Sequence, residues 1–221
     1  ALSSPGGVNS DTGIIGGTRA LPCIHGPNIK EIIQNKSGLP VEIENDANCA
    51  ALCEVWKGTA VGNNDVLFVV IGSGIGGAVV IDRKVHKGAN LHSGEFGNMI
   101  MDTVDDINNI SFRTWSELAA IGALVRRVAE IKGIDVSNLD GKQVFAAAEA
   151  GDRECMKAID DFHLSLAKGI FNLQYVYDPE KIIIGGAVSS NENLIKQINK
   201  KIDIIMNSLQ GAKVRPIIEA C

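Results

Sequence analysis

The apolar run at residues 66–71 constrains the fold most, because its β-branched side chains predict a strand that is buried on both faces. The glycine loop Gly72-Ser73-Gly74-Ile75-Gly76-Gly77 follows it directly, and residues 78–81 return to the same β-branched character. The pattern therefore predicts a strand, a turn and a second strand. Asp82-Arg83-Lys84 then predicts another tight turn before a short return strand.

This glycine loop matches the G-x-G-x-x-G spacing of a dinucleotide-binding fingerprint, but that fingerprint requires a helix after the third glycine. Residues 78–81 are short and β-branched, which argues against such a helix. A glycine loop within a hairpin can still bind phosphate, because its backbone N–H groups converge on an anion and the Ser73 hydroxyl adds a donor. The alternative is a tight turn or bulge that needs positive φ.

A second informative stretch is Glu44-Asn45-Asp46-Ala47-Asn48, where a predicted strand at residues 39–44 meets a helix rich in small residues. Asp46 is expected in the first helical turn, where free N–H groups and the helix dipole favour an ionised carboxylate. Such a group is a candidate catalytic base. The alternative is that Asn45 or Asp46 serves only as the helix N-cap.

The rest of the chain alternates predicted strands and helices, which indicates an α/β fold. Residues 3–26 are read as a loop-rich edge, and residues 28–35 as a short helix. Three helices are expected from Trp115 onward, the longest over residues 152–177 with His163 as a partnered core residue in its apolar stripe. A buried strand at 181–184 and a last helix follow, and Ser189-x-x-Glu192 is read as the capping box of that helix.

Charge and cysteine content exclude several classes of function. The net charge is -5 without a block of Lys or Arg, which argues against nucleic-acid binding. The five cysteines include no C-x-x-C pair, so neither a disulfide framework nor a cysteine zinc site is indicated, and Cys49 and Cys53 are expected to pack in the core. No stretch approaches the length of a membrane span, and a cytoplasmic protein is expected. Both chain ends look cut, so further segments are expected before and after them.

Five motifs in order resemble those of the ROK family of repressors and sugar kinases, and the resemblance spans nearly the whole chain. They are Ser3-Ser4-Pro5-Gly6 with Thr12-Gly13-Ile14-Ile15, Glu44-Asn45-Asp46-Ala47-Asn48, the glycine loop from Gly72 to Gly77, Gly94-Glu95-Phe96-Gly97 and Ile184-Gly185-Gly186. The resemblance implies the actin-like ATPase (ribonuclease H-like) fold. Residues 1–44 would be the remainder of a small N-terminal domain, and residues 45–221 would form the large C-terminal domain.

The resemblance also implies an ATP-dependent kinase that phosphorylates the 6-hydroxyl of a hexose or hexose derivative with Mg²⁺. Glucose, N-acetylmannosamine and β-glucosides are the acceptors considered, and relatives commonly form homodimers. The alternative is a non-catalytic sugar-binding regulator. A third possibility, a nucleotide-dependent dehydrogenase, would require the glycine loop to be a dinucleotide-binding fingerprint, which the missing helix argues against. The implied roles are proton acceptor for Asp46, sugar binding for Asn45, Glu95, Asn98 and Glu117, phosphate binding for Gly72, Ser73, Gly74 and Gly76, and adenosine contact for Gly185 and Gly186. Glu117 has a rival role, because Thr114-x-x-Glu117 is also a capping box.

Several positions depart from the family pattern. Many relatives bind a structural zinc through a histidine at the position of Asn98 and a following cysteine cluster, but residues 99–115 contain neither Cys nor His, so no zinc is expected. Packing of Ile107, Ile110 and Phe112 should hold that loop instead, and His92 with Glu95 is only a weak zinc pair.

The sugar site and the phosphate site also lack family residues. Ala20 replaces a sugar-binding asparagine, and His25 is a nearby substitute. The family's opening Asp-x-Gly-Gly-Thr hairpin, which binds phosphate and supports the metal, is absent, and Gly16-Gly17-Thr18 is read as a loop and not as its replacement. Residues 1–221 are therefore expected to bind sugar and to turn over poorly.

Overall fold

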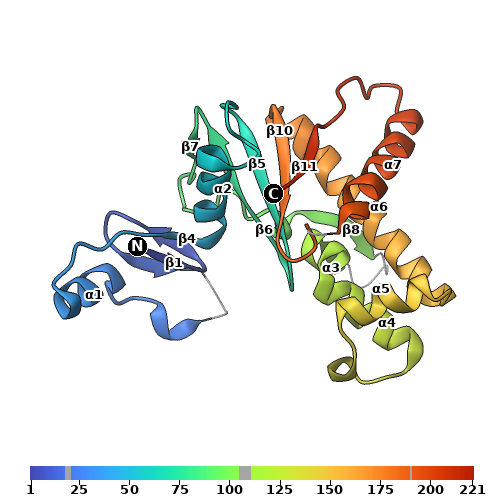
Figure 1. Ribbon diagram of the computed structural model, residues 1–221, viewed down its shortest axis with the longest axis horizontal. Helices are drawn as coiled ribbons and strands as arrows, with labels where there is room; N and C mark the ends of the chain where they lie inside the picture. Colours follow the sequence, from blue (N-terminus) through green and yellow to red (C-terminus); the bar gives the residue numbers. More distant parts are fainter. Residues whose placement is uncertain (18–20, 105–110, 190) are drawn as a thin grey trace.

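The centre of the molecule is a five-stranded sheet (Figure 1). The computed structural model describes residues 1–17, 21–104, 111–189 and 191–221. The strands of the sheet are β5 (Val66–Ile71), β6 (Ile75–Ile81), β7 (Lys84–Val85), β10 (Lys181–Gly185) and β11 (Ile218–Ala220). Their order is β11-β10-β5-β6-β7, with β10 parallel to β5 and β11, and β6 antiparallel to β5 and β7. The predicted strand, turn and strand are confirmed, and so is the turn before β7.

Successive side chains along each strand point to opposite faces of the sheet, so the apolar core is divided between these two faces. On one face the sheet packs against α2 (Asp46–Lys57), and on the other against a larger helical layer. The α2 face of β5 carries Val66, Phe68 and the partly buried Val70, and the opposite face carries Leu67, Val69 and Ile71. This two-sided burial explains why the strand is apolar at every position.

The helical layer consists of α3 (Trp115–Ala119), α4 (Ile121–Lys132), α5 (Gly141–Glu149), α6 (Arg153–Tyr177) and α7 (Glu192–Ser208). The long helix α6 packs against the other four, and its stripe of Phe162, Leu166, Ile170 and Leu173 is fully buried. Short 3₁₀ turns lie at Pro22–Ile24, Phe96–Asn98 and Val136–Asn138. The sequence pattern therefore locates α6 correctly but predicts one helix too few between Trp115 and β10.

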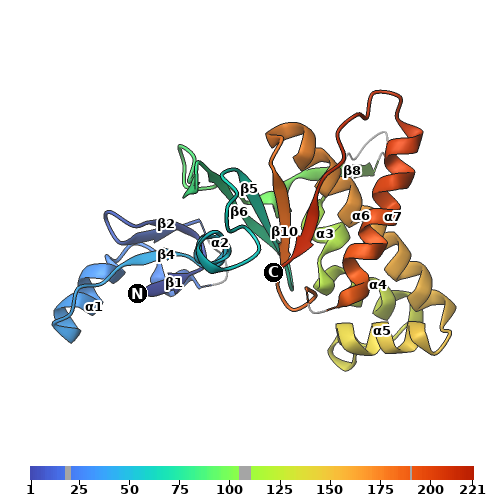
Figure 2. The ribbon, with the colours of Figure 1, turned by 45° about the horizontal axis from the view of Figure 1, so that its top comes forward.

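The N-terminal part forms a small layer beside α2 (Figures 1 and 2). It contains β1 (Leu2–Ser4), β2 (Gly7–Asn9), β3 (Ile14–Gly16), α1 (Ile29–Ser37) and β4 (Ile43–Asn45). β1 pairs in parallel with β4, and β2 pairs antiparallel with β3. Val8, Ile15 and Ile43 form a cluster of their own. The division into domains at residues 44 and 45 remains a prediction.

A further hairpin connects the central sheet to α3. β8 (Ile100–Val104) pairs antiparallel with β9 (Ser111–Thr114), and Arg113 forms an ion pair with Asp102. Phe112 is 56% exposed, so the expectation that its packing holds this segment is wrong. Ile107 and Ile110 lie outside the described residues. Among the described residues, no helix is both long and apolar enough to span a membrane.

Four local predictions are corrected by the structure. The strand predicted at residues 39–44 is confined to β4. The capping box read at Ser189-x-x-Glu192 does not form, because the side chain of Asn191 caps α7 and the Ser189 hydroxyl donates to the Gly186 carbonyl. Cys53 is exposed rather than in the core, and Cys49 is half-buried. Residues 3–26, read as a loop-rich edge, contain two short strands and part of a third.

Candidate active site

The catalytic candidate lies where β4 passes directly into α2. Asn45 is the N-cap of α2, because its side-chain oxygen accepts a hydrogen bond from Asn48 N at 3.1 Å. Its amide nitrogen also donates to the Gly6 carbonyl at 3.1 Å. Asp46 is the first residue of the helix and is exposed, with Oδ1 2.9 Å from Ala47 N. The N-cap alternative is therefore confirmed for Asn45, which leaves the Asp46 carboxylate free to face solvent at the positive end of the helix dipole.

Two pockets meet at Asp46. One, of about 530 Å³, is also lined by Gly72, Ser73, Gly74, Gly76 and Gly186. The other, of about 700 Å³, is also lined by Asn45, Glu95 and Asn98. Asp46 thus lies where the two pockets meet, and Gly74 and Gly76 of the glycine loop line both of them as well. A carboxylate beside both a glycine loop and a pocket with polar side chains is an arrangement that can serve phosphoryl transfer.

The glycines of these motifs fall into two physical groups. A Cβ added at Gly72 or Gly76 would meet no atom within 4 Å, so the missing side chains keep the pocket open. A Cβ at Gly77 would instead collide with the Phe68 carbonyl and the Phe96 ring, and one at Gly186, whose φ is 93°, would meet the Ile71 carbonyl. The first group fits a phosphate cradle, whereas the second is required by packing and backbone conformation.

Contacts from the helical layer hold the glycine loop in place. Ile75 N donates to the Ser116 hydroxyl at 2.9 Å, and Ile121 N donates to the Gly72 carbonyl at 2.9 Å. Within the loop, Gly72 N donates to the Gly74 carbonyl at 2.9 Å. The second half of the loop already belongs to β6, so the third glycine lies in a strand and no helix begins there, as predicted. The sequence pattern gave no reason to single out Ser116.

The predicted sugar-binding residues do not all come together. Glu95 and Asn98 are exposed and line the pocket that Asn45 and Asp46 also line. Glu117 is not among the residues that line either pocket, and its carboxylate accepts hydrogen bonds from the Thr114 N–H at 2.7 Å and hydroxyl at 3.0 Å. Those two bonds hold the pKa of Glu117 below its usual value. The capping box is therefore confirmed, and a sugar contact of Glu117 remains a prediction.

An apolar pocket of about 570 Å³ continues beyond Gly186. It is lined by residues that include Ile121, Phe145, Val188 and Leu194. Gly185 ends β10, where a Cβ would meet the Phe68 ring. The pocket lies next to the glycine pair in the chain, because Ala187 and Val188, which follow Gly186, are among its lining residues.

No group of three or more His, Cys, Asp or Glu residues within the described residues could hold a metal ion. The His92 ring lies near Gly17, where an added Cβ would be 2.8 Å from its Nε2. His25, the expected substitute in the sugar site, does not line the Asp46 pockets, and its buried Nε2 has no hydrogen-bond partner among the described residues. Thr18 and Ala20 lie outside the described residues.

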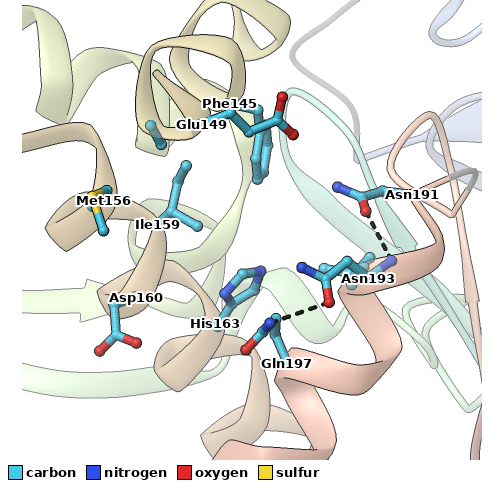
Figure 3. Close-up of a pocket in the computed structure, with 11 residues that line it drawn as sticks. Phe145, Glu149, Met156, Ile159, Asp160, His163, Asn191, Asn193 and Gln197 are labelled. Carbon is cyan, nitrogen blue, oxygen red and sulfur yellow. Dashed lines mark hydrogen bonds between the residues drawn. The ribbon is translucent and has the colours of Figure 1, made fainter. Parts of the chain in front are cut away.

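Figure 3 shows a fourth pocket, of about 360 Å³, between α5, α6 and α7. His163 lies beside Asn193 and Gln197 there, is 8% exposed and forms no hydrogen bond with a described residue. The prediction that His163 lies in the core is confirmed, but the predicted hydrogen-bond partner is not found among the described residues. Burial lowers the pKa of His163 to about 4, with Asp160 opposing and Lys201 assisting the shift.

Stability should therefore fall in acid because of His163. The unfolded chain takes up a proton on this ring below about pH 6.5 and the folded protein only near pH 4, so the free energy of unfolding falls between these values as pH decreases. We expect the loss to reach roughly 2 kcal/mol, since His163 is not completely buried. Urea unfolding at pH 7.0, 5.5 and 4.5 would measure it. A His163→Gln variant should show a shallower pH dependence, whereas exposed His86→Gln should not; equal slopes in all three proteins would contradict the assignment.

Two functional features escape the sequence pattern. Cys53 and Cys221 line the pocket that contains Asp46 and the glycine loop. Glu44 forms an ion pair with Lys87, with Oε2 and Nζ 2.6 Å apart. Asp46 and Cys53 are seven residues apart on α2, so helical periodicity could have placed Cys53 on the same face as Asp46. Nothing in the sequence near Glu44 or Lys87 indicates their ion pair.

Comparison with known proteins gives consistent matches. The model of the ROK family matches residues 1–220. A beta-glucoside kinase of Listeria monocytogenes is 34% identical over 203 residues, which are 92% of this chain and 69% of that protein. A ROK family protein of Streptococcus pneumoniae, solved with sucrose, has a TM-score of 0.88 at 37% identity. The match covers 100% of this chain and 73% of the Streptococcus pneumoniae chain. A ROK family glucokinase of Streptomyces griseus, solved with glucose and AMPPNP, has a TM-score of 0.78 at 26% identity, covering 97% of this chain and 73% of its own. Relatives named as xylose repressors also match, over less than half of their length.

Proposed function

The chain belongs to the ROK family, whose sugar kinases share the actin-like ATPase fold, and from this premise we propose that it is an ATP-dependent sugar kinase. The γ-phosphate of ATP would pass to the 6-hydroxyl of a hexose or hexose derivative. The observation that carries this proposal is the position of Asp46, which lines both the glycine-loop pocket and the pocket of Asn45, Glu95 and Asn98.

Asp46 would act as the proton acceptor. As the sugar oxygen attacks the γ-phosphorus, the bond from that phosphorus to the β-γ bridging oxygen breaks, ADP leaves, and the hydroxyl proton passes to the Asp46 carboxylate. The carboxylate lies at the N-terminus of α2, the positive end of the helix dipole. Because the transition state is loose, alignment of the two substrates contributes more than the base does, and proton transfer comes late.

The sugar would be held by groups that accept and donate hydrogen bonds around the ring. Carboxylate oxygens of Asp46 and Glu95 can each accept from hydroxyls, and the amides of Asn45 and Asn98 can do both. Asn45 is already fixed by its bonds to Asn48 and Gly6, so its orientation costs little when sugar binds. A sugar with the wrong stereochemistry would leave such groups unpaired, at a cost of about 1 to 3 kcal/mol for each.

ATP would extend from the glycine loop past Gly186. Gly72 and Gly76 suit the phosphate groups of ATP, because their backbone can approach phosphate oxygens without a side chain in the way. The apolar pocket that includes Ile121, Phe145 and Val188 would bind the adenine ring of ATP. Mg²⁺, bound to the phosphates and water, would neutralise phosphate charge.

Glucose, N-acetylmannosamine and β-glucosides are the acceptors we propose, and the beta-glucoside kinase relative supports the last of them. The position of the new phosphate tests the reaction. The chain should convert one of these sugars to its 6-phosphate, identified by ³¹P and ¹³C NMR, and should not phosphorylate the matching 6-deoxy sugar. Phosphate on another hydroxyl would contradict the role given to the Asp46 pocket.

The alternative is a sugar-binding regulator without catalysis, because some relatives are named as repressors. The intact Asp46 at the junction of both pockets favours the kinase. Tight sugar binding without any sugar phosphate formed would favour the regulator.

A further inference from the structure

We propose that Lys87 is a positioning residue that ties the loop bearing Glu95 and Asn98 to the strand end bearing Asn45 and Asp46. The inference rests on the proposed function, because those four residues are the ones assigned there to sugar binding and proton transfer. Lys87 itself does not line either pocket at Asp46.

Lys87 joins three parts of the chain that are far apart in sequence. Its Nζ is 2.6 Å from Glu44 Oε2 and donates to the Ser10 hydroxyl at 2.6 Å. Ser10 belongs to the turn between β2 and β3, Glu44 to β4, and Lys87 begins the loop that follows β7. The side chains of Lys87 and Glu44 are 27% and 20% exposed, so the pair is partly shielded from water and is screened less than a surface pair.

The partner carboxylate bonds directly to the start of α2, next to Asp46. Glu44 Oε1 accepts a hydrogen bond from Asn45 N at 2.8 Å and from Asn48 Nδ2 at 3.0 Å. Burial, the largest single influence, raises the pKa of Glu44, but the hydrogen bonds from Lys87, Asn48 and Asn45 together hold it below its usual value. One ionised carboxylate therefore binds Lys87 with one oxygen and the start of α2 with the other.

The same loop touches the N-terminal hairpin at a second point. A Cβ at Gly7 would lie 3.5 Å from His92 Cε1 and 3.6 Å from Leu91 Cβ, and one at Gly17 would lie 2.8 Å from His92 Nε2. The loop is thus packed near His92 as well as tied at Lys87. Loss of Lys87 should loosen the loop without detaching it, which alters the distance between Glu95 and Asp46 rather than the fold.

Hydrogen exchange and kinetics test this role together. Lys87→Met keeps the length of the side chain but removes its charge, and Lys84→Met is the matched control, because the exposed Lys84 side chain forms no ion pair or hydrogen bond within the described residues. In Lys87→Met, backbone amides of residues 87–98 should exchange at least tenfold faster. The KM for sugar should rise about tenfold or more, and the KM for ATP should change less than twofold. Lys87→Arg should recover most of both effects.

Each outcome decides a separate question. Exchange and sugar KM unchanged in Lys87→Met would overturn the positioning role. Equal rises in the KM for sugar and ATP would also overturn it, because they would indicate a general structural defect. If the unsubstituted protein phosphorylates no sugar, the proposed function fails, while exchange in residues 87–98 still decides whether Lys87 ties the loop. If Lys87→Met does not fold, Ser10→Ala, which removes one of the two contacts, should show a smaller change in the same direction.

Discussion

An Asp46→Asn variant is expected to bind sugar normally and to lose about two to four orders of magnitude in kcat. Asparagine has the shape of aspartate and can keep the contact to Ala47 N, but its neutral amide cannot accept the hydroxyl proton. Sugar affinity, measured by calorimetry, should stay within a few-fold, because Asp46 is one of several hydroxyl partners in that pocket. The loss should therefore appear in kcat and not in the KM for sugar.

Asp161→Asn is the control, since Asp161 is exposed on α6 and lies outside both pockets that contain Asp46. Its kcat should equal that of the unsubstituted protein. Both variants are best compared in a version with an Asp-x-Gly-Gly-Thr hairpin added before Ala1, where the starting rate is expected to be higher. Activity of Asp46→Asn within tenfold of the unsubstituted protein would remove Asp46 from its role.

Alanine substitutions at two adjacent glycines should affect different properties, stability at Gly77 and ATP kinetics at Gly76. Gly77→Ala is expected to lower the free energy of unfolding by about 3 kcal/mol or more, because the new methyl group would collide with the Phe68 backbone and the Phe96 ring. Gly76→Ala should change it by less than about 1 kcal/mol, because its Cβ meets no atom within 4 Å and its φ is not in the left-handed region. Gly76 lines both pockets that contain Asp46, so the new methyl group would occupy open space there.

Gly76→Ala should accordingly raise the KM for ATP about tenfold or more with normal stability, while Gly77→Ala should unfold at lower urea concentration. Urea unfolding followed by circular dichroism, with nucleotide kinetics on the folded variants, measures both. A destabilised Gly76→Ala with unchanged ATP kinetics would mean that Gly76 serves packing and not phosphate binding.

The central sheet and the start of α2 could be predicted because their signals are local. Residues 66–71 are apolar at every position since both faces of β5 are covered, and Asn45 before a run of small residues indicates a helix start. The short strand β4 could not be delimited from its pattern, because Leu39 is 64% exposed although it fits the apolar alternation of residues 39–44.

Features that depend on distant parts of the chain could not be predicted. The ion pair between Glu44 and Lys87 requires the loop after β7 to return to β4, which neither local sequence indicates. Cys53 was expected in the core, but the helix turns this position toward the pocket between α2 and the glycine loop. At α7 the helix begins at Glu192, so Asn191 and not Ser189 is the residue in the N-cap position, a start point that the sequence pattern placed too early.

Release of ADP by residues 1–221, and by a version preceded by an Asp-x-Gly-Gly-Thr hairpin, tests the central claim most directly. Each protein would be given ATP, Mg²⁺ and a panel of glucose, N-acetylmannosamine and β-glucosides. The account predicts ADP release that depends on one of these sugars, equals the sugar phosphate formed, and is faster with the hairpin. No sugar-dependent ADP release from either protein, with sugar binding still measurable, would contradict it, and equal rates from both would contradict the expected need for the hairpin.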